Sequence, residues 1–446
     1  MRIKLESIRN CLEGAVPGTI STCAPDGTPN IAYLSQIQYV DGEHVALSYQ
    51  FFNTTRRNIL ASPYARLAAI DPHTAAHYRL SLQYLRTEQS GPLFESMKAK
   101  LAGIASHTGM GDVFRLLGSD IYRVLDIEQV PGQTVPLPRP ERNMLAALRA
   151  FSEDLCGAAD LDDLFARVLT SLERNLGIEN AMLLMVDETG RRLYTIASLG
   201  YSDSGVGSEI AFGEGVIGVA ARERTPIRIS HFTSEYNYSC AIRDNLALEG
   251  CLELETKIPL PGLAASCSQL AVPIKACDRL IGVLYVESQQ DMRFGYDDED
   301  ALVTLAGQLG AGIRLLQQAA EAPIEATTQV APTRPPDNGG KPLAVRHYAE
   351  NDSVFLDGNY LIKGVAGAIF WTLIRDFVEL GRIDFNNREL RLDRRIRLPD
   401  LSDNLEARLI LLERRLAEHA APVRIEKTGR GRFRLKVTRA IELFDA

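Results

Sequence analysis

The chain is expected to fold as a multidomain α+β protein, for three reasons. Its 446 residues exceed the roughly 100 to 200 residues that one hydrophobic core usually serves. Proline-rich segments at 131–140 and 319–342 suit neither a helix interior nor a central strand. Elsewhere, short alternating apolar runs are interspersed with helical apolar spacing. We therefore predict domains at 1–135, 141–318 and 343–446, with 319–342 as a flexible linker.

Composition excludes several classes of protein. Hydrophobic residues at 46% and charged residues at 24% match globular averages, which excludes a mostly disordered, collagen-like or coiled-coil chain. The longest apolar runs, such as 280–286, are far shorter than the roughly 18 to 20 residues that cross a bilayer, and the first ten residues include no apolar signal-peptide core. Seven scattered cysteines indicate no disulfide framework. These features predict a cytoplasmic protein with reduced thiols and no membrane segment.

Charge is distributed unevenly around the net value of −8. Residues 343–446 contain 19 Lys and Arg against 16 Asp and Glu, which gives +3 and leaves −11 for the rest. The narrower window 388–439 holds 15 basic and 8 acidic residues. A polyanionic partner is therefore expected for the C-terminal part of the chain and not for the whole.

The first domain shows the pattern of a small antiparallel barrel. Turn signals at Asp26-Gly27 and Asp41-Gly42 separate alternating apolar strands, as in β-hairpins. The expected elements are strands at 18–23, 30–40, 44–50, 64–71, 78–87 and 120–130, and helices at 53–62 and 91–107. Their order predicts a closed or half-closed β-barrel with two helices.

The paired hairpin and the polar, doubly basic start of helix 53–62 resemble the flavin-binding split barrel of the pyridoxamine-phosphate-oxidase type, over about residues 5–130. The resemblance implies a two-fold homodimer and an FMN phosphate site at Asn53, Thr54, Thr55, Arg56, Arg57 and Asn58. A helix N-terminus offers free N–H groups, and arginine adds paired donors to phosphate oxygens. In the alternative interpretation, the two arginines only solvate an exposed helix end. No catalytic base is evident among the scattered histidines.

The second domain begins and ends with apolar seams. The first is Met144, Leu148, Phe151 and Leu155, and the second is Leu302, Leu305, Leu309, Ile313 and Leu316. Heptad spacing of this kind predicts helices that bundle across a homodimer, although a helix that faces its own core gives the same pattern.

Between the seams, the glycine-rich helix entry at 212–229, the S-x-L-A-V-P-I strand at 268–274 and the hairpin strand at 280–288 resemble a GAF domain. The resemblance covers about residues 160–318. It implies an α/β sandwich with flanking helices that binds a small molecule, a chromophore or a metal centre and transmits that binding to the helices.

One connection, 231–267, is longer than in that family and contains Cys240, Cys251 and Cys267. Long connections tend to be functional, and three thiolates would favour an iron–sulfur cluster or zinc. A fourth ligand would be His231 or, if the loop folds over, Cys277, which is otherwise expected at a hairpin tip. The spacing matches no Cys-x-x-Cys knuckle, so buried or incidental thiols are the alternative.

The third domain is expected to hold a strand pair, three helices and a basic hairpin, in that order. The expected elements are strands at 353–362, a helix at 364–381 ended by Gly381, a short element at 388–392, a long helix at 401–420 and a hairpin at 423–437. This order resembles the winged helix-turn-helix at the C-terminus of response regulators. The resemblance implies that the long helix enters the DNA major groove and that the hairpin is the wing.

The side chains expected to be exposed and available for DNA are Asn404, Arg408, Arg414 and Arg415 on the helix and Lys427, Arg430, Arg432 and Arg434 on the wing. Glu413 and Glu418 on the same helix would repel phosphate if they faced it. The alternative is a protein-binding winged helix whose charges face water.

Together these features predict a one-component bacterial transcriptional regulator. It would be a homodimer that senses a small molecule, a redox state or a metal centre and binds double-stranded DNA. The rival hypothesis is a flavin-dependent oxidoreductase with regulatory GAF and interaction domains. An enzyme is the less expected of the two.

Overall fold

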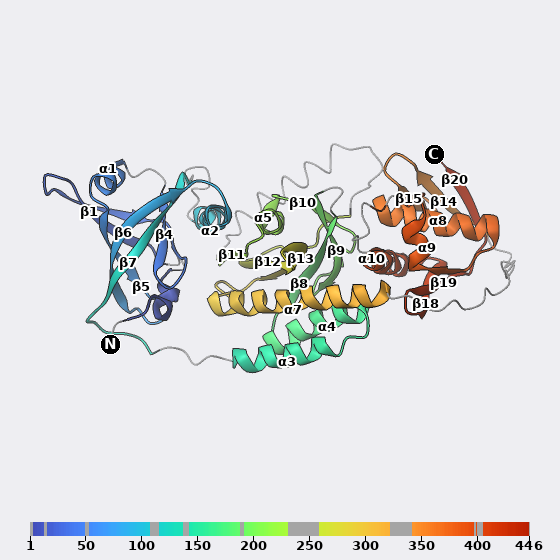
Figure 1. Ribbon diagram of the computed structural model, residues 1–446, viewed down its shortest axis with the longest axis horizontal. Coiled ribbons are helices and arrows are strands. Elements are labelled where there is room, and N and C mark those ends of the chain that lie inside the picture. Colours follow the sequence, from blue (N-terminus) through green and yellow to red (C-terminus); the bar gives the residue numbers. More distant parts are fainter. Residues whose placement is uncertain are drawn as a thin grey trace.

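The computed structural model describes residues 3–12, 16–49, 53–107, 116–136, 142–187, 191–230, 258–321, 341–396, 398 and 405–445. Three lobes lie in a row, with the N-terminal and C-terminal lobes on opposite sides of a central one (Figure 1). Helices and sheets occur in all three, so the architecture is mixed α and β.

The N-terminal lobe is a curled antiparallel sheet in the order β2-β1-β5-β6-β7-β4-β3. Its elements are η1 (Leu5–Leu12), β1 (Gly18–Cys23), β2 (Pro29–Leu34), β3 (Ile37–Tyr39), β4 (His44–Tyr49), α1 (Asn53–Ala61), β5 (Tyr64–Ile70), β6 (His77–Glu88), α2 (Pro92–His107) and β7 (Gly118–Val130). Only Ser35 and Gln36 separate β2 from β3, yet these strands lie at opposite edges of the sheet. The sheet must therefore curl into a partly closed barrel, and the single strand expected at 30–40 is two strands.

The central lobe is a six-stranded antiparallel sheet in the order β10-β9-β8-β13-β12-β11. Its elements are α3 (Met144–Cys156), α4 (Leu161–Leu176), β8 (Asn180–Asp187), β9 (Arg192–Leu199), β10 (Glu209–Ala211), α5 (Gly215–Glu223), β11 (Ile227–Ile229), β12 (Ser268–Ala276), β13 (Arg279–Ser288) and α7 (Tyr296–Glu321). Helices α3, α4 and α7 cover one face of the sheet, and α5 covers the other. Gly310 allows α7 to lie close to β12, because a Cβ there would come within 2.2 Å of the Lys275 carbonyl oxygen.

Both apolar seams pack inside this lobe. Phe151 of α3 and four seam residues of α7 (Leu302, Leu305, Leu309 and Ile313) are at most 1% exposed. Helix α3 lies against α4 and α7 of the same chain. The seams therefore serve the core of one protomer and give no support for a bundle across a homodimer. A helical layer over a sheet and a two-chain bundle require the same apolar spacing, so the sequence could not separate them.

The C-terminal lobe contains two sheets, in the orders β16-β15-β14-β20 and β17-β19-β18. Its elements are β14 (Leu343–Tyr348), β15 (Ser353–Leu356), β16 (Asn359–Ile362), α8 (Gly364–Leu380), β17 (Asp384–Asn386), α9 (Asn387–Leu392), α10 (Leu405–Glu418), β18 (Val423–Gly429), β19 (Arg432–Val437) and β20 (Ile441–Asp445). Gly381 ends α8 in the left-handed conformation, at a φ of 68°. Strands β14, β17 and β20 were not expected, because each is short or pairs with a segment distant in sequence.

Within the described ranges, none of the helices combines the length and the apolar character needed to span a membrane.

Candidate functional site

Helix α10 lies at the seam between the central and C-terminal lobes (Figure 1). One side packs on α8, β16 and β18 of its own lobe, and another side packs on α4 and β9 of the central lobe. Every residue from Leu405 to Leu416 is buried or half-buried as a result. Arg408 and Arg415 were expected to be exposed, but only 5% and 8% of their surfaces are. That expectation was wrong because helical spacing shows neither the face of α10 that the central lobe covers at Arg408 nor the contact of Arg415 with Leu361 in its own lobe.

Four ion pairs between described residues join α10 and its surroundings to the central lobe. They are Arg408–Asp187, Arg414–Asp162, Lys427–Asp160 and Lys363–Glu209, with N–O distances of 3.1, 2.7, 2.8 and 3.1 Å. In each pair the cation belongs to the C-terminal lobe and the carboxylate to the central lobe. The central lobe therefore presents negative charge to a basic face, as a polyanion would.

Arg408 and Arg414 make further contacts with the central lobe. The Arg408 guanidinium lies 4.3 Å from the centre of the Tyr194 ring, which is the geometry of a cation–π interaction. Arg414 donates one hydrogen bond to Asp162 and a second, of 2.7 Å, to the carbonyl oxygen of Ile196. Both arginines are thus bound to groups of the central lobe.

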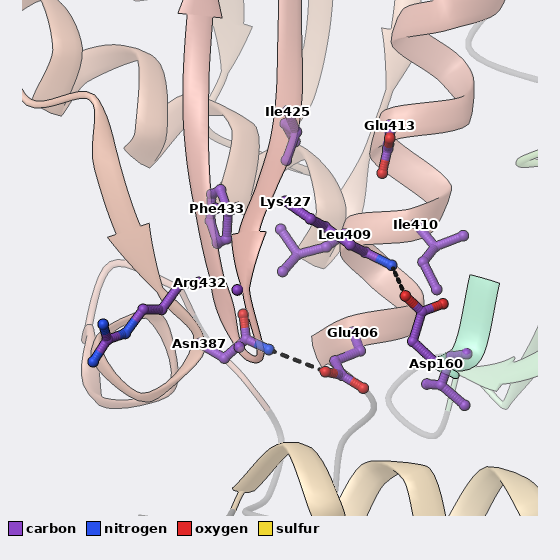
Figure 2. Close-up of a pocket in the computed structure, with 13 residues that line it drawn as sticks. Asp160, Asn387, Glu406, Leu409, Ile410, Glu413, Ile425, Lys427, Arg432 and Phe433 are labelled. Carbon is purple, nitrogen blue, oxygen red and sulfur yellow. Dashed lines mark hydrogen bonds and ion pairs between the residues drawn. The ribbon is translucent and has the colours of Figure 1, made fainter. Parts of the chain in front are cut away.

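A cavity of about 60 Å³ lies in the same seam (Figure 2). Its apolar lining includes Leu161, Leu409, Ile410, Ile425 and Phe433, and its charged lining is Asp160, Glu406, Glu413, Lys427 and Arg432. Figure 2 shows the Lys427 side chain crossing the seam to Asp160, and Asn387 donating to Glu406. The cavity is therefore closed by groups from both lobes.

Packing at the seam shifts the pKa values of the carboxyl groups around this cavity. Burial raises the pKa of Glu406, and it raises the pKa of Glu413 with the nearby Asp162 carboxylate acting in the same direction. Burial opposes ionisation of Asp160, but hydrogen bonds from the Asp163 N–H and from Lys427 outweigh it and lower the pKa of Asp160. Asp160 also caps the N-terminus of α4, where it accepts the Asp163 N–H bond at 3.0 Å.

Two of the predicted DNA-binding residues are held within the C-terminal lobe. Arg415 donates to the carbonyl oxygen of Leu361 at 3.1 Å. Arg434 forms an ion pair of 2.8 Å with Asp384. These contacts join α10 to β16 and β19 to β17, so both side chains also have a structural role.

The other candidates lie at the hairpin or outside the described residues. Arg430 is exposed at the hairpin turn, and Arg432 lines the cavity. Asn404 lies outside the described residues. Glu418, which was expected to repel phosphate, accepts a hydrogen bond from Ser204 of the central lobe. The acidic groups of α10 thus lie at the seam together with its arginines.

In the N-terminal lobe, the predicted phosphate site is divided between the barrel interior and the surface. Thr55 is buried and accepts a bond of 2.9 Å from Asn30. Asn58 is buried and donates to Thr22 at 3.1 Å. These two residues hold α1 on the barrel.

Arg56 is also engaged within the barrel. It forms an ion pair of 2.8 Å with Asp120 and lies 4.9 and 5.4 Å from the ring centres of Tyr49 and Tyr84. The cavity beside it measures about 10 Å³, which is close to the space that one water molecule needs. A flavin ring does not fit into this cavity within a single chain.

Thr54 and Arg57 are exposed on the first turns of α1, and the side chain of Asn53 lies outside the described residues. The fit to FMN is therefore partial. The phosphate could be held by these two side chains and the free N–H groups of α1, and the ring would need a surface supplied by a second chain.

Of the three cysteines predicted to bind a metal, only Cys267 lies within the described residues. Cys267 is half-buried, and its thiol donates to the Ala265 carbonyl oxygen at 3.7 Å. Burial and the nearby Asp291 carboxylate raise the pKa of Cys267, which disfavours the thiolate that a metal requires. No group of three or more His, Cys, Asp or Glu residues in the described ranges is suited to hold a metal ion.

The other predicted metal ligands lie either outside the described residues or far from Cys267. Cys240, Cys251 and His231 lie outside the described residues. Cys277 lies at the tip of the β12–β13 hairpin, as expected, and the whole of β12 separates it from Cys267. Nine strand residues at about 3.3 Å each span about 30 Å, so Cys277 and Cys267 do not share a metal.

A buried carboxyl group of the central lobe gives little signal in the sequence. Glu287 of β13 is 3% exposed and accepts bonds from the Leu263 N–H at 3.1 Å and the Tyr285 hydroxyl at 3.3 Å. Burial raises the pKa of Glu287, although the hydroxyls of Ser266 and Tyr201 oppose the shift. The only sequence signal was a glutamate within an otherwise apolar strand.

Comparison with known families identifies the central lobe. The GAF domain family matches residues 160–313, which include α4, the sheet, α5 and most of α7. The chain therefore contains a GAF domain, as its sequence predicted. The comparison with curated proteins gave no match.

Parts of the chain are similar to solved structures. The GAF domain of an Acinetobacter phosphoenolpyruvate-protein phosphotransferase is 19% identical, over 40% of this chain and 98% of that one, with a TM-score of 0.31. A free methionine-R-sulfoxide reductase from Neisseria meningitidis is 18% identical over 41% and 98%, with a TM-score of 0.31. An FMN-binding protein from Syntrophomonas wolfei is 15% identical over 28% and 86%, with a TM-score of 0.24.

Proposed function

We propose that this chain is a one-component transcriptional regulator of the bacterial type, acting in the cytoplasm. In it the GAF domain binds a small-molecule or redox signal and the C-terminal lobe binds double-stranded DNA. The supporting observation is the basic face formed by α10 and the β18–β19 hairpin, whose described cations Arg408, Arg414 and Lys427 bind carboxylates of the GAF domain. A surface that binds closely spaced carboxylates has the charge needed for phosphates.

The order of elements in the C-terminal lobe supports the same proposal. A sheet is followed by α8, the short α9, α10 and a two-stranded hairpin. This is the order of a winged helix, in which α10 is the helix that enters the major groove and β18–β19 is the wing. Arg430 and Arg432 lie at the tip of this wing, where backbone contacts are expected.

The first test is binding of the full chain to duplex DNA in dilute buffer. We expect affinity to fall steeply with added salt, because each phosphate contact releases counterions. An Arg430→Ala/Arg432→Ala variant should bind about tenfold more weakly, since two such contacts are lost. An Arg149→Ala/Arg314→Ala variant removes the same charge from exposed positions of α3 and α7 and should bind as the parent chain does. Equal binding by both variants would show that the hairpin does not contact DNA.

The second candidate function is a flavin-dependent oxidoreductase. Exposed Thr54 and Arg57 at the N-terminus of α1 favour it. If it holds, the chain binds added FMN as a homodimer and oxidises a reduced nicotinamide, and Thr54→Ala/Arg57→Ala weakens FMN binding while Arg66→Ala does not. A colourless chain that fails to bind added FMN excludes this function.

A further inference from the structure

We infer that the GAF domain holds the C-terminal lobe in an arrangement that excludes α10 from DNA, by using its own carboxylates in place of phosphates. The inference rests on the proposed function and concerns its regulation. The surface responsible consists of Asp160, Asp162 and Asp187, which we call the acidic edge of the GAF domain. Its partner is the basic face of this chain's own C-terminal lobe.

The covering of α10 excludes entry into a DNA groove. A helix with its side chains is about 10 to 12 Å wide, and the major groove is about 12 Å wide, so an entering helix must have one free side. Residues 405–416 have none, because α4 and β9 cover the side that the C-terminal lobe leaves open. DNA and the GAF domain therefore compete for the same side of α10.

The contacts also compete chemically. Arg408, Arg414 and Lys427 are three of the residues proposed to contact DNA, and each is neutralised by one member of the acidic edge. The fourth described pair has the same arrangement, with the cation Lys363 on the C-terminal lobe and the carboxylate of Glu209 on the GAF domain. An interface formed only for stability needs no such sorting of charge, whereas one that replaces a polyanion does.

The contact combines exposed ion pairs with buried apolar residues, since Leu161 of the GAF domain and Leu409 and Ile410 of α10 belong to one hydrophobic cluster. Lys427 and Asp160 are each nearly half exposed, at 47% and 46%, and such pairs contribute little to stability. Arg408 is buried against Tyr194, and apolar residues line the cavity in the same seam. Both lobes belong to one chain, so even a weak contact is favoured by a high effective concentration. A signal in the GAF domain would need to alter this contact by only a few-fold to change DNA binding.

The wing is less covered than the helix. Arg430 at the hairpin turn is exposed in this arrangement. We call the chain docked when the C-terminal lobe contacts the acidic edge, and undocked when it does not. The docked chain can therefore reach a DNA backbone through the wing and cannot read bases through α10. We expect the parent chain to bind DNA weakly and without sequence preference, and the undocked chain to bind tightly and selectively.

The test is an Asp160→Asn/Asp162→Asn variant of the full chain. Asparagine preserves the cap of α4 while the negative charge is lost. In small-angle X-ray scattering the variant should be more extended than the parent chain, and its affinity for a selected DNA sequence should rise about tenfold, because apparent affinity scales with the undocked fraction. A Glu153→Gln/Glu173→Gln variant removes two charges from exposed positions of α3 and α4 and should match the parent in both measurements.

Each result supports or overturns the inference. An extended variant with higher affinity supports it together with the proposed function. An extended variant whose DNA affinity equals that of a DNA-binding parent overturns the inference and leaves the proposed function intact. A variant that stays compact shows that the acidic edge does not hold the lobes together. An extended variant that binds no DNA at all, like its parent, overturns the proposed function and the inference together.

Discussion

The GAF domain contacts a lobe on each side, and the two contacts differ in how charge is arranged. On the barrel side each lobe supplies one cation: Arg9 of the barrel pairs with Asp300 at 2.8 Å, and Arg222 of the GAF domain pairs with Glu95 at 3.4 Å. On the other side every described pair has its cation on the C-terminal lobe. Under the proposed function, the barrel contact is fixed and the contact with the C-terminal lobe is the one that phosphate replaces.

The centre of each contact shows the same difference. Tyr296 joins the GAF domain to the barrel by accepting the Tyr39 N–H bond and donating to the Leu12 carbonyl oxygen, both at 3.3 Å. The guanidinium groups of Arg9 and Arg228 lie 4.5 and 4.4 Å from the centre of its ring. At the other seam, four ion pairs between described residues lie beside apolar residues such as Leu161 and Ile410. Salt should therefore loosen the second contact before the first.

The largest expected effect is at the barrel contact. Tyr296→Ala should destabilise the chain by about 3 to 5 kcal/mol, the usual cost of truncating a buried aromatic side chain. Urea unfolding at low and high salt measures it, and the loss should be the same at both. Tyr296→Phe, which keeps the ring and removes two hydrogen bonds, should cost about 1 kcal/mol. A loss that disappears at high salt would contradict the comparison of the two contacts.

The next effect is at the other contact. Asp187→Asn leaves Arg408 buried beside Tyr194 without the carboxylate 3.1 Å away. A buried charge that loses its partner is costly, and here undocking relieves the cost because Arg408 then returns to water. We expect scattering to show an extended chain and unfolding by urea to stay nearly unchanged. A large loss of folding stability with a compact chain would show that the two lobes form one inseparable unit.

A smaller effect concerns the salt dependence of DNA binding. In the parent chain, salt weakens both DNA binding and the ion pairs that compete with it. Asp160→Asn/Asp162→Asn removes two of these competing pairs, so the logarithmic salt slope should become steeper by roughly one to two units. Titrations between low and moderate salt measure the slope. Parallel slopes for parent and variant would mean that the acidic edge and DNA do not use the same cations.

The smallest effect is the pH dependence of docking. Burial raises the pKa of Glu413 in the docked chain, so its ionised form opposes docking and its protonation favours it. Docking should therefore strengthen as pH falls from 7 toward 5, and Glu413→Gln should favour the docked form roughly twofold at pH 7. The pKa of Glu406 is raised as well, so Glu406 contributes to the pH dependence in the parent chain and in the Glu413→Gln variant. The pKa of Asp160 is lowered, so Asp160 loses its charge only in more acidic solution. Scattering across this range measures the docked fraction, and an unchanged profile in the variant would assign the dependence to Glu406.

Local patterns predicted most of the fold. The turn at Gly381, the hairpin tip at Cys277 and the existence of the two seam helices follow from local turn residues and apolar spacing, which act over a few residues. The strand at 30–40 was predicted as one element, because the bend at Ser35–Gln36 arises from closing the barrel and has no local turn signal.

The candidate sites were predicted less well. The sequence located the basic residues of α10 and the hairpin but could not show that Arg408 faces Asp187, more than 200 positions away in the chain. In the same way, the sequence could not show that Arg56 lies 2.8 Å from Asp120, which is 64 positions away in the chain. Pairing of charges depends on distances of a few ångströms between remote segments, and no local pattern encodes it.

The sequence alone determined the mixed α+β character, the GAF domain and the surplus of positive charge near the C-terminus, because composition and local patterns suffice for these. The tertiary structure decided which side of α10 is covered and which carboxylates neutralise its arginines. Coulomb energy and burial act through space, so only the packing of one lobe on another could assign partners to those charges.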